Sequence, residues 1–222
     1  MRNKIINGLA GIVLAGSLYF SDGLNAVDID TNNLVVRIND VNYPIKKSVS
    51  VQRTEEHLLI INNRKSPNYS SRMEKNIEGI VIHSTEGSGG SALNWLINPQ
   101  SKVSAHYLVM EDGVIYQLVD DLDKAWHAGR KANLSYIGIE IAGYANKKDF
   151  SFTDLQYDRT GLLLSHLMKK HKLTRENVVS HGWISKNLGG TSHTDPGPNF
   201  KWDQLDKSIL KYFAGKVSIE RK

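Results

Sequence analysis

The chain has 222 residues, of which 40% are hydrophobic and 23% charged, a balance typical of a folded globular protein rather than a disordered, fibrous or multi-span membrane protein. It contains no cysteine, which excludes disulfide bonds, thiolate metal ligands and cysteine nucleophiles. The net charge of +5 suits loose attraction to an anionic polymer, but no basic run is long enough to predict binding to nucleic acid.

The first 26 residues have the pattern of a secretory signal peptide. Arg2 and Lys4 precede a mostly apolar stretch over residues 5–20, and Ala26 is a suitable small residue before a cleavage site. An uncleaved membrane anchor is the alternative, although the stretch is shorter than the ~20 residues that comfortably span a bilayer. We therefore expect an exported protein, periplasmic or extracellular, with no stable membrane span after cleavage.

The next part of the chain predicts a small β-rich extension. Short apolar runs at 34–38, 48–51 and 57–61 are typical of strands, and Asn39–Asp40 supplies turn chemistry between the first two. The polar stretch 62–76 predicts a linker or a wrapping loop. The expected domain organisation is a signal peptide (1–26), a β-rich N-terminal extension (27–65) and a main domain (66–222).

Strand and helix patterns are clearest after residue 77. Residues 79–83 (GIVIH) form a β-branched run typical of a strand buried on both faces. Thr153 and Gln156 form a capping box before a helix whose apolar residues recur at helical spacing, and Asp203 is expected to cap a last helix. Other strands are predicted at 103–110, 114–119, 136–141 and 178–180, and a short helix at 91–98. We therefore predict an α/β fold with a single mixed central β-sheet flanked by helices.

Two of the eight histidines lie where predicted strands end, His83 after GIVI and His181 after VVS, and Asp195 follows in a loop rich in glycine and proline. Two imidazoles and one carboxylate match a catalytic zinc site, which uses three protein ligands and keeps a fourth position for water. Zinc lowers the pKa of such a water to about 7. A histidine at a strand end is, however, more often hydrogen-bonded in the core or at the surface than bound to a metal, so the spacing alone leaves both interpretations open.

Five motifs in chain order carry a resemblance to a known family. They are IVIHST (80–85), SAHYLV (104–109), AWHAG (125–129), IGIEI (137–141) and SHGWISKNLGGTSHTDPG (180–197). With the lead-in SPNYSSR (66–72), they resemble the zinc-dependent N-acetylmuramoyl-L-alanine amidases, a family that includes phage-lysozyme-type amidases, bacterial cell-wall amidases and peptidoglycan recognition proteins. The resemblance runs from about residue 66 to about residue 213, and it implies an amidase-type fold and one Zn²⁺ ion per chain.

The resemblance also implies roles for individual residues. His83, His181 and Asp195 correspond to the three zinc ligands. Glu140 corresponds to a catalytic acidic residue, placed where a carboxylate takes a proton from the attacking water. His193 stands where many bacterial members carry lysine, although the cell-wall autolysin branch carries histidine there. We expect His193 to stabilise the oxyanion or to protonate the leaving amine.

Two further histidines belong to recurrent motifs of the family. His106 lies in SAHYLV and His127 in AWHAG. We expect both to line the substrate groove. For His106, a hydrogen-bonded position in the core is the alternative.

The function that the resemblance implies is zinc-dependent hydrolysis of the amide between N-acetylmuramic acid and L-alanine, in bacterial peptidoglycan or muropeptides. Two other functions stay open: a non-catalytic peptidoglycan-binding module, which usually lacks a zinc ligand, and a zinc peptidase that cuts within the stem peptide. An intracellular recycling enzyme is a third alternative, which the expected signal peptide opposes. The sequence does not indicate an oligomeric state.

Overall fold

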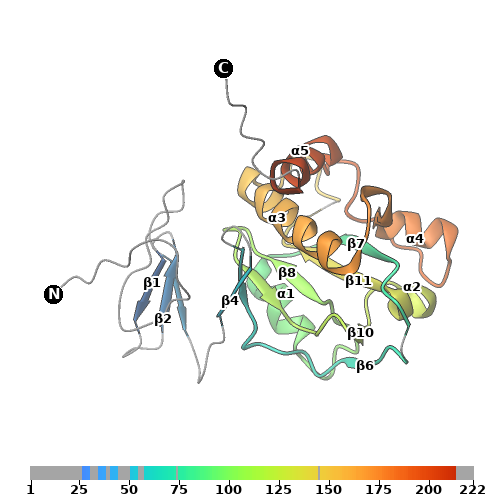
Figure 1. Cartoon of the computed structure of the whole chain (residues 1–222), viewed down its shortest axis with the longest axis horizontal. Coiled ribbons are helices and arrows are strands. Elements are labelled where there is room, and N and C mark those ends of the chain that lie inside the picture. Colours follow the sequence, from blue (N-terminus) through green and yellow to red (C-terminus); the bar gives the residue numbers. More distant parts are fainter. Residues whose placement is uncertain are drawn as a thin grey trace, which may run out of the picture. The chain divides into compact units, whose positions relative to one another are not determined.

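The computed structural model describes residues 58–73, 75–144 and 146–213, together with the backbone of four strands before them (Figure 1). These strands are β1 (Val27–Asp30), β2 (Val35–Ile38), β3 (Val41–Pro44) and β4 (Val51–Thr54). The expected signal peptide and the turn at Asn39–Asp40 lie outside the described residues. Within the described part of the chain, no helix is both long enough and apolar enough to cross a membrane.

The chain divides into two units, Met1–Ser50 and Val51–Lys222. In the first unit, β1, β2 and β3 form an antiparallel three-stranded sheet, of which the apolar run at 34–38 predicted β2. The domain boundary expected at residue 65 is wrong, because β4 and β5 (Leu58–Ile61) belong to the central sheet of the second unit. Leu58 and Ile60 are buried in the main core, which explains why this apolar run joins the larger unit.

The central sheet has seven strands in the order β12-β7-β11-β8-β9-β5-β4. Its remaining members are β7 (Gly79–Ser84), β8 (Tyr107–Val109), β9 (Ile115–Gln117), β11 (Tyr136–Ile141) and β12 (Val178–Ser180). Strands β12, β7, β11 and β8 run parallel, whereas β8–β9 and β5–β4 are antiparallel pairs. The prediction of a single mixed sheet is therefore confirmed, and every residue of β7 is buried, as its β-branched run predicts.

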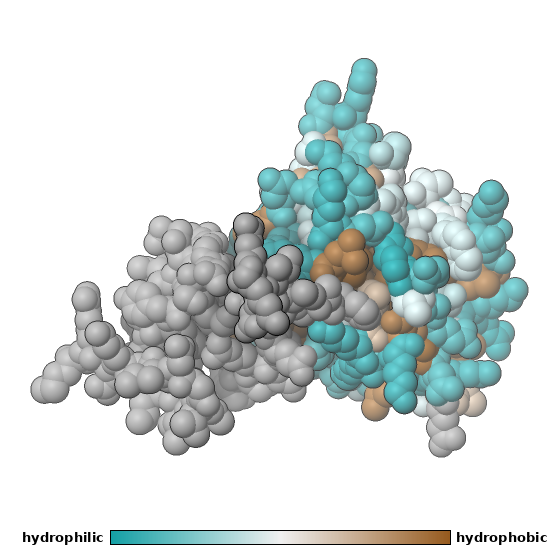
Figure 2. All heavy atoms as spheres, turned by 45° about the horizontal axis from the view of Figure 1, so that its top comes forward, coloured by the Kyte–Doolittle hydropathy of each residue, from teal (hydrophilic) through white to brown (hydrophobic). Residues whose placement is uncertain are grey.

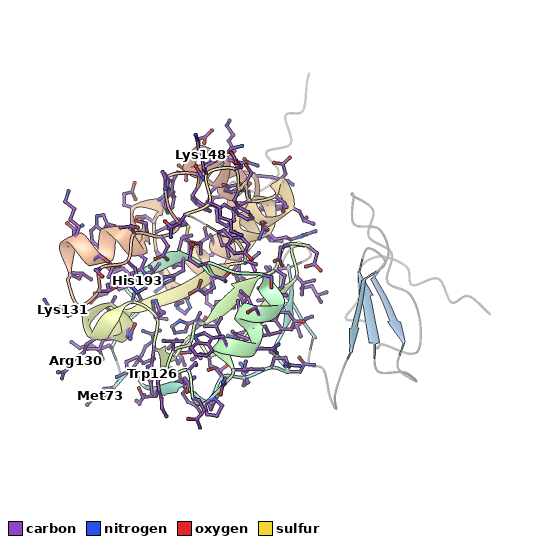
Figure 3. All side chains as sticks on the ribbon, turned by 180° about the vertical axis from the view of Figure 1, so that it is seen from behind. Met73, Trp126, Arg130, Lys131, Lys148 and His193 are labelled. Atoms are coloured by element: carbon purple, nitrogen blue, oxygen red, sulfur yellow. The ribbon has the colours of Figure 1, made fainter. Side chains whose placement is uncertain are left out.

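Helices cover both faces of this sheet (Figures 1 and 3). Helices α3 (Asp154–His171) and α5 (Trp202–Phe213) lie side by side on one face, and α1 (Gly89–Leu96) lies on the other. The short helices are α2 (Gly129–Ser135), α4 (His181–Asn187) and the 3₁₀ turn η1 (Arg175–Asn177). The capping box of α3 is present as predicted, but α5 begins at Trp202, so Asp203 lies within its first turn rather than at its cap.

Side chains alternate along β7, so the residues that enter the main core and the candidate ligand His83 point to opposite faces of the sheet. Ile80 and Ile82 point into the core formed with α3 and α5. Val81 points to the opposite face, where it packs against Ala132 of α2 and Ile184 of α4. Because side chains alternate across a strand, His83 lies on the same face as Val81. The face that carries the histidine is therefore the one covered by the short helices.

The polar segment 62–76 wraps around the second unit, and it is not a free linker. Its strand β6 (Tyr69–Ser71) pairs antiparallel with β10 (Asp123–Ala125). The Asn68 side chain is buried and donates from Nδ2 to the carbonyl oxygens of Asn98 and Val103, at 2.8 and 2.9 Å. These bonds attach the segment to the loop that follows α1. On the face shown in Figure 2, hydrophilic side chains predominate among the described residues, with separate hydrophobic areas between them.

Asp121 is the centre of a buried polar network, and its removal should destabilise the fold. Its carboxylate accepts hydrogen bonds from Tyr107 Oη (2.6 Å), Lys170 Nζ (2.7 Å) and His171 Nε2 (2.8 Å). Burial opposes ionisation, but these donors outweigh it and lower the pKa of Asp121. We expect Asp121→Asn to cost roughly 2–4 kcal/mol in urea unfolding at pH 7, because it leaves the buried network incompletely paired.

The neighbouring residue provides the control for this variant. Asp120 pairs with Lys65 at the surface, where its side chain is 65% exposed. Asp120→Asn should lower the free energy of unfolding by less than about 1 kcal/mol. Since the folded-state pKa of Asp121 is lowered, its contribution is present above the unfolded-state pKa and is lost as the pH falls through the folded-state value. Equal effects of the two substitutions would contradict the assignment of a stabilising network.

Candidate metal and catalytic site

Three predicted ligands meet at the carboxyl ends of the parallel strands. His83 lies near the end of β7, and His181 follows β12 directly as the first residue of α4. The carboxyl ends of parallel strands share one edge of a sheet, which brings these two histidines together. Asp195 reaches the same point from the loop after α4, where its backbone carbonyl accepts a hydrogen bond from the Gly182 amide at 3.2 Å.

The donor atoms of these three residues converge tightly. Nδ1 of His83 lies 3.0 Å from Nδ1 of His181 and 3.1 Å from Oδ2 of Asp195. Oδ1 of Asp195 lies 3.1 Å from His181 Nδ1. One ligand atom from each residue lies within 4.8 Å of the others, in the only such group of three that the described residues contain. Two nitrogens and one oxygen suit a divalent metal such as zinc.

The protonation states favoured by this arrangement fit a metal ligand set. Burial lowers the pKa of His83, so the ring is neutral and offers a lone pair. Burial alone would raise the pKa of Asp195, but its contacts with the His181 and His83 imidazoles outweigh that effect and lower the pKa, so the carboxylate is charged. Metal ligands must be deprotonated to bind, and here both conditions are met without a metal.

The outer nitrogens of the two ligand histidines also have partners. Nε2 of His83 lies 3.0 Å from Nδ1 of His127. Nε2 of His181 lies 3.1 Å from Oγ1 of Thr191 in the glycine-rich loop. Such partners orient metal-binding imidazoles. Thr191 is not among the site residues predicted from the sequence, and its only sequence signal is its position ten residues after His181, directly after Gly189 and Gly190.

Glu140 lies beside the ligand cluster. It pairs with His83 across the parallel strands β11 and β7, so both side chains point to the same face of the sheet. Its Oε2 is buried and has no hydrogen-bond partner. Burial, followed by the negative charges of Asp195 and Glu86, raises the pKa of Glu140 to about 8. A carboxyl group with an unpartnered buried oxygen and a raised pKa, next to a cluster of possible metal ligands, is characteristic of an acid–base catalyst.

His193 lies at the solvent side of the cluster. Its ring stacks on that of His181 with centroids 4.8 Å apart, and its Nδ1 is 3.9 Å from Oδ1 of Asp195. Its side chain is 70% exposed, so it is accessible to a substrate. Figure 3 shows His193 on the same side of the unit as Arg130 and Lys131, the exposed basic residues at the start of α2.

The structure does not place His106 in a groove. Its side chain has no exposed surface, Nδ1 accepts a hydrogen bond from the Gly138 amide at 2.9 Å, and Nε2 faces the Asp123 carbonyl at 3.1 Å. Burial and the adjacent Arg72 guanidinium lower the pKa of His106 to about 3, which keeps the ring neutral. The expectation that His106 lines the substrate groove is therefore corrected, because a fully buried ring cannot contact a substrate. The alternative of a hydrogen-bonded core position describes it.

The His127 ring is partly buried, and it contacts His83 at Nε2, whereas Asp195 contacts His83 at Nδ1. Its Nδ1 faces His83, and its Nε2 lies 3.3 Å from the Tyr136 carbonyl. Both ring nitrogens are thus directed at protein groups. This position differs from the groove-lining role expected for His127.

A mixed α/β sheet brings two histidines together at its strand ends, and a following loop adds an aspartate beside Glu140. This arrangement could hold a metal ion and is typical of hydrolases. Residues 73–198, more than half of the chain, match the N-acetylmuramoyl-L-alanine amidase family. The chain belongs to this family, as its motifs indicate.

Several relatives of known name are similar to the chain. The 1,6-anhydro-N-acetylmuramyl-L-alanine amidase AmpD of Haemophilus influenzae is 36% identical over 118 residues, which cover 50% of this chain and 60% of the relative. The N-acetylmuramoyl-L-alanine amidase AmiD of Escherichia coli is 34% identical over 149 residues, or 58% of this chain and 52% of the relative. The chain therefore spans about half to three-fifths of the length of these curated relatives.

Solved structures agree with the fold. A crystal structure of an AmpD derivative superimposes with a TM-score of 0.56 at 27% identity, covering 65% of this chain and 92% of that one. E. coli AmiD, solved with anhydro-N-acetylmuramic acid-L-Ala-D-gamma-Glu-L-Lys, has a TM-score of 0.52 at 27% identity, covering 71% of this chain and 65% of that one. The prediction of an amidase-type fold is confirmed.

Proposed function

We propose that this protein is a zinc-dependent N-acetylmuramoyl-L-alanine amidase that hydrolyses the amide between N-acetylmuramic acid and L-alanine in peptidoglycan or muropeptides. The observation that carries the proposal is the convergence of His83, His181 and Asp195 within 4.8 Å, beside the unpartnered Oε2 of Glu140. The family match and the names of the relatives support the choice of substrate.

The three ligands would hold the zinc ion, which when bound acts as a Lewis acid on the amide carbonyl and lowers the pKa of water. Glu140 accepts a proton from the water that attacks the carbonyl carbon. The proton then passes to the amide nitrogen of L-alanine as the C–N bond breaks, which leaves a lactyl carboxylate and a free amine. Glu140, whose pKa is raised by burial, would be held more in its carboxylate form when a cation is bound nearby, because an opposite charge favours that form.

The test is product analysis with purified full-length chain and intact peptidoglycan, with added zinc, with chelator, and with zinc restored. The expected result is new N-terminal L-alanine with intact glycan chains, lost with chelator and recovered with zinc. New amino termini only within the stem peptide would indicate a zinc peptidase instead. Wall binding without new termini would indicate a peptidoglycan-binding module.

His193 should assist catalysis without holding the metal. We expect His193→Ala to lower kcat by about 10–100-fold, because a donor to the oxyanion or leaving amine is lost, while zinc content is unchanged. His193→Lys should recover part of the activity, because lysine also supplies a proton donor. The measurements are kcat on a soluble muropeptide and zinc by atomic absorption. Wild-type kcat in His193→Ala would assign His193 to the surface alone.

We also propose that residues 1–26 direct export and are removed after Ala26. The positively charged start and the apolar stretch of the sequence support this proposal. Expression of the full chain in a bacterial host, followed by N-terminal sequencing of the exported protein, should give Val27 as the first residue. Retention of the complete chain in the cytoplasmic fraction would contradict export, and retention in the membrane fraction would indicate an uncleaved anchor.

A further inference from the structure

Five of the eight histidines form a continuous array through the site. Successive ring centroids are separated by 5.6 Å (His106–His127), 5.1 Å (His127–His83), 4.5 Å (His83–His181) and 4.8 Å (His181–His193). Only part of this array is explained by metal binding and catalysis. His127 stands between the buried His106 and the ligand His83, and the proposed reaction gives it no role.

The hydrogen-bond chemistry at His127 has a defined direction. A backbone carbonyl only accepts hydrogen bonds, so the 3.3 Å contact with the Tyr136 carbonyl requires the proton of His127 to be on Nε2. A neutral imidazole carries a single N–H, so with the proton on Nε2 the Nδ1 atom of His127 is an acceptor. Nε2 of His83, 3.0 Å away, must then be the donor.

This direction matches the requirement of a metal ligand. With its proton on Nε2, His83 presents the lone pair of Nδ1 to His181 and Asp195. The Tyr136 carbonyl thus sets the tautomer of His127, and His127 sets that of His83. A free histidine interconverts between a tautomer with its proton on Nδ1 and one with its proton on Nε2. Only the Nε2-protonated tautomer of His83 can bind a metal through Nδ1. Because His127 accepts a hydrogen bond from Nε2 of His83, it favours that tautomer.

The His127 ring is itself held in position by its surroundings. A Cβ atom on Gly138 would lie 2.6 Å from both Cγ and Nδ1 of His127, so the ring rests on the bare backbone of β11. The backbone amide of His127 donates to Oδ1 of Asn133 at 3.0 Å. Glycine weakens a strand interior, and close approach of another group is a usual reason for one there. The glycine of the IGIEI motif is explained by the space that His127 needs.

The second ligand histidine is supported differently. Nε2 of His181 faces the Thr191 hydroxyl, which can both donate and accept. A hydroxyl therefore does not select a tautomer, and Thr191 lies in a partly exposed loop. Thr191 provides an internal comparison for the effect of His127.

We infer that His127 is a positioning residue that fixes the tautomer and orientation of the ligand His83 and thereby raises zinc affinity. The inference rests on the metal site of the proposed function. It replaces the expectation that His127 contacts substrate. It predicts that loss of the acceptor at Nδ1 weakens zinc binding itself, before any effect on substrate.

The experiment measures Zn²⁺ affinity of the purified full-length chain by competition with a chromogenic chelator, without substrate. His127→Phe retains a planar ring but has no acceptor, and we expect zinc affinity to fall about 10–100-fold. His127→Asn retains an acceptor oxygen near the position of Nδ1 and should recover most of the affinity. Thr191→Val should lower affinity less than His127→Phe. Thermal unfolding of the zinc-free variants reports any general loss of fold.

A second variant covers the case in which His127→Phe does not fold. Gly138→Ala keeps His127 but displaces its ring, so it should also weaken zinc binding, and the visible spectrum of the Co²⁺-substituted protein should change with the ligand geometry. The inference is overturned if folded His127→Phe binds zinc as tightly as the wild type does. If His127→Phe does not fold, the same result with folded Gly138→Ala overturns it. It is also overturned if His127→Asn is as weak as His127→Phe, or if the wild type binds no zinc. If the wild type binds zinc but has no amidase activity, the proposed function is rejected, and the effect of His127 on zinc affinity can still be measured.

Discussion

Glu140→Gln should lower kcat by about 10²–10⁴-fold and leave the zinc content at the wild-type level. The substitution keeps the size of the side chain but removes its ability to accept a proton. Since Glu140 is not among the converging ligand atoms, the metal should remain bound. The measurements are kcat on a muropeptide and zinc per chain after dialysis against trace zinc.

The same variant has a second effect that catalysis cannot explain. In the zinc-free protein, the pKa of Glu140 is raised to about 8 because of burial and the charges of Asp195 and Glu86. A raised pKa means that its contribution to stability is present below the unfolded-state pKa and is lost as the pH rises through the folded-state value. We therefore expect the zinc-free wild type to lose about 3 kcal/mol between pH 5 and pH 8, and Glu140→Gln to remove most of this loss.

Glu176→Gln is the matched control, since Glu176 lies exposed in η1 and is not among the converging ligand atoms. It should retain wild-type kcat and the wild-type loss of stability between pH 5 and pH 8, because the pKa of Glu176 is lowered and its titration lies below that range. An inactive Glu140→Gln that has also lost zinc would assign Glu140 to metal binding. An active one would exclude it as the proton acceptor.

Replacing any one zinc ligand should abolish both metal binding and activity. We expect His83→Ala, His181→Ala and Asp195→Ala each to lose stoichiometric zinc, because two remaining ligands hold the ion too weakly, and to lower kcat/KM by more than about 10³-fold. The measurements are zinc content, product formation with excess zinc, and the Tm with and without zinc. Zinc should raise the Tm of the wild type but not of the three ligand variants, since it stabilises by binding the folded state.

A histidine outside the array gives the control for the ligand variants. His171 bonds to Asp121 at 2.8 Å and is not among the converging ligand atoms. His171→Ala should lower the Tm and keep both zinc and kcat. Full activity of His83→Ala in metal-free buffer would contradict the proposal that His83 binds a zinc ion needed for the reaction.

Local patterns in the sequence determined much of this protein. The β-branched run of β7 predicted a buried strand, the capping box predicted the start of α3, and ordered motifs predicted the family. These features depend on neighbouring residues, so they can be read along the chain. The three ligand positions were predicted with the help of the family resemblance, because each lies in a recognisable motif.

Tertiary contacts decided the rest. Residues 58–61 looked like part of an extension, yet they pair with β9 and enter the main core, since strand pairing joins segments that are distant in sequence. His106 and His127 belong to equally prominent motifs, but packing around Gly138 buries one and turns the other toward His83. The bond from Thr191 to His181 likewise depends on how the glycine-rich loop returns to the site. Sequence determined which residues are available for chemistry, whereas burial and hydrogen-bond direction in the folded chain decided which of them face the metal, the solvent or each other.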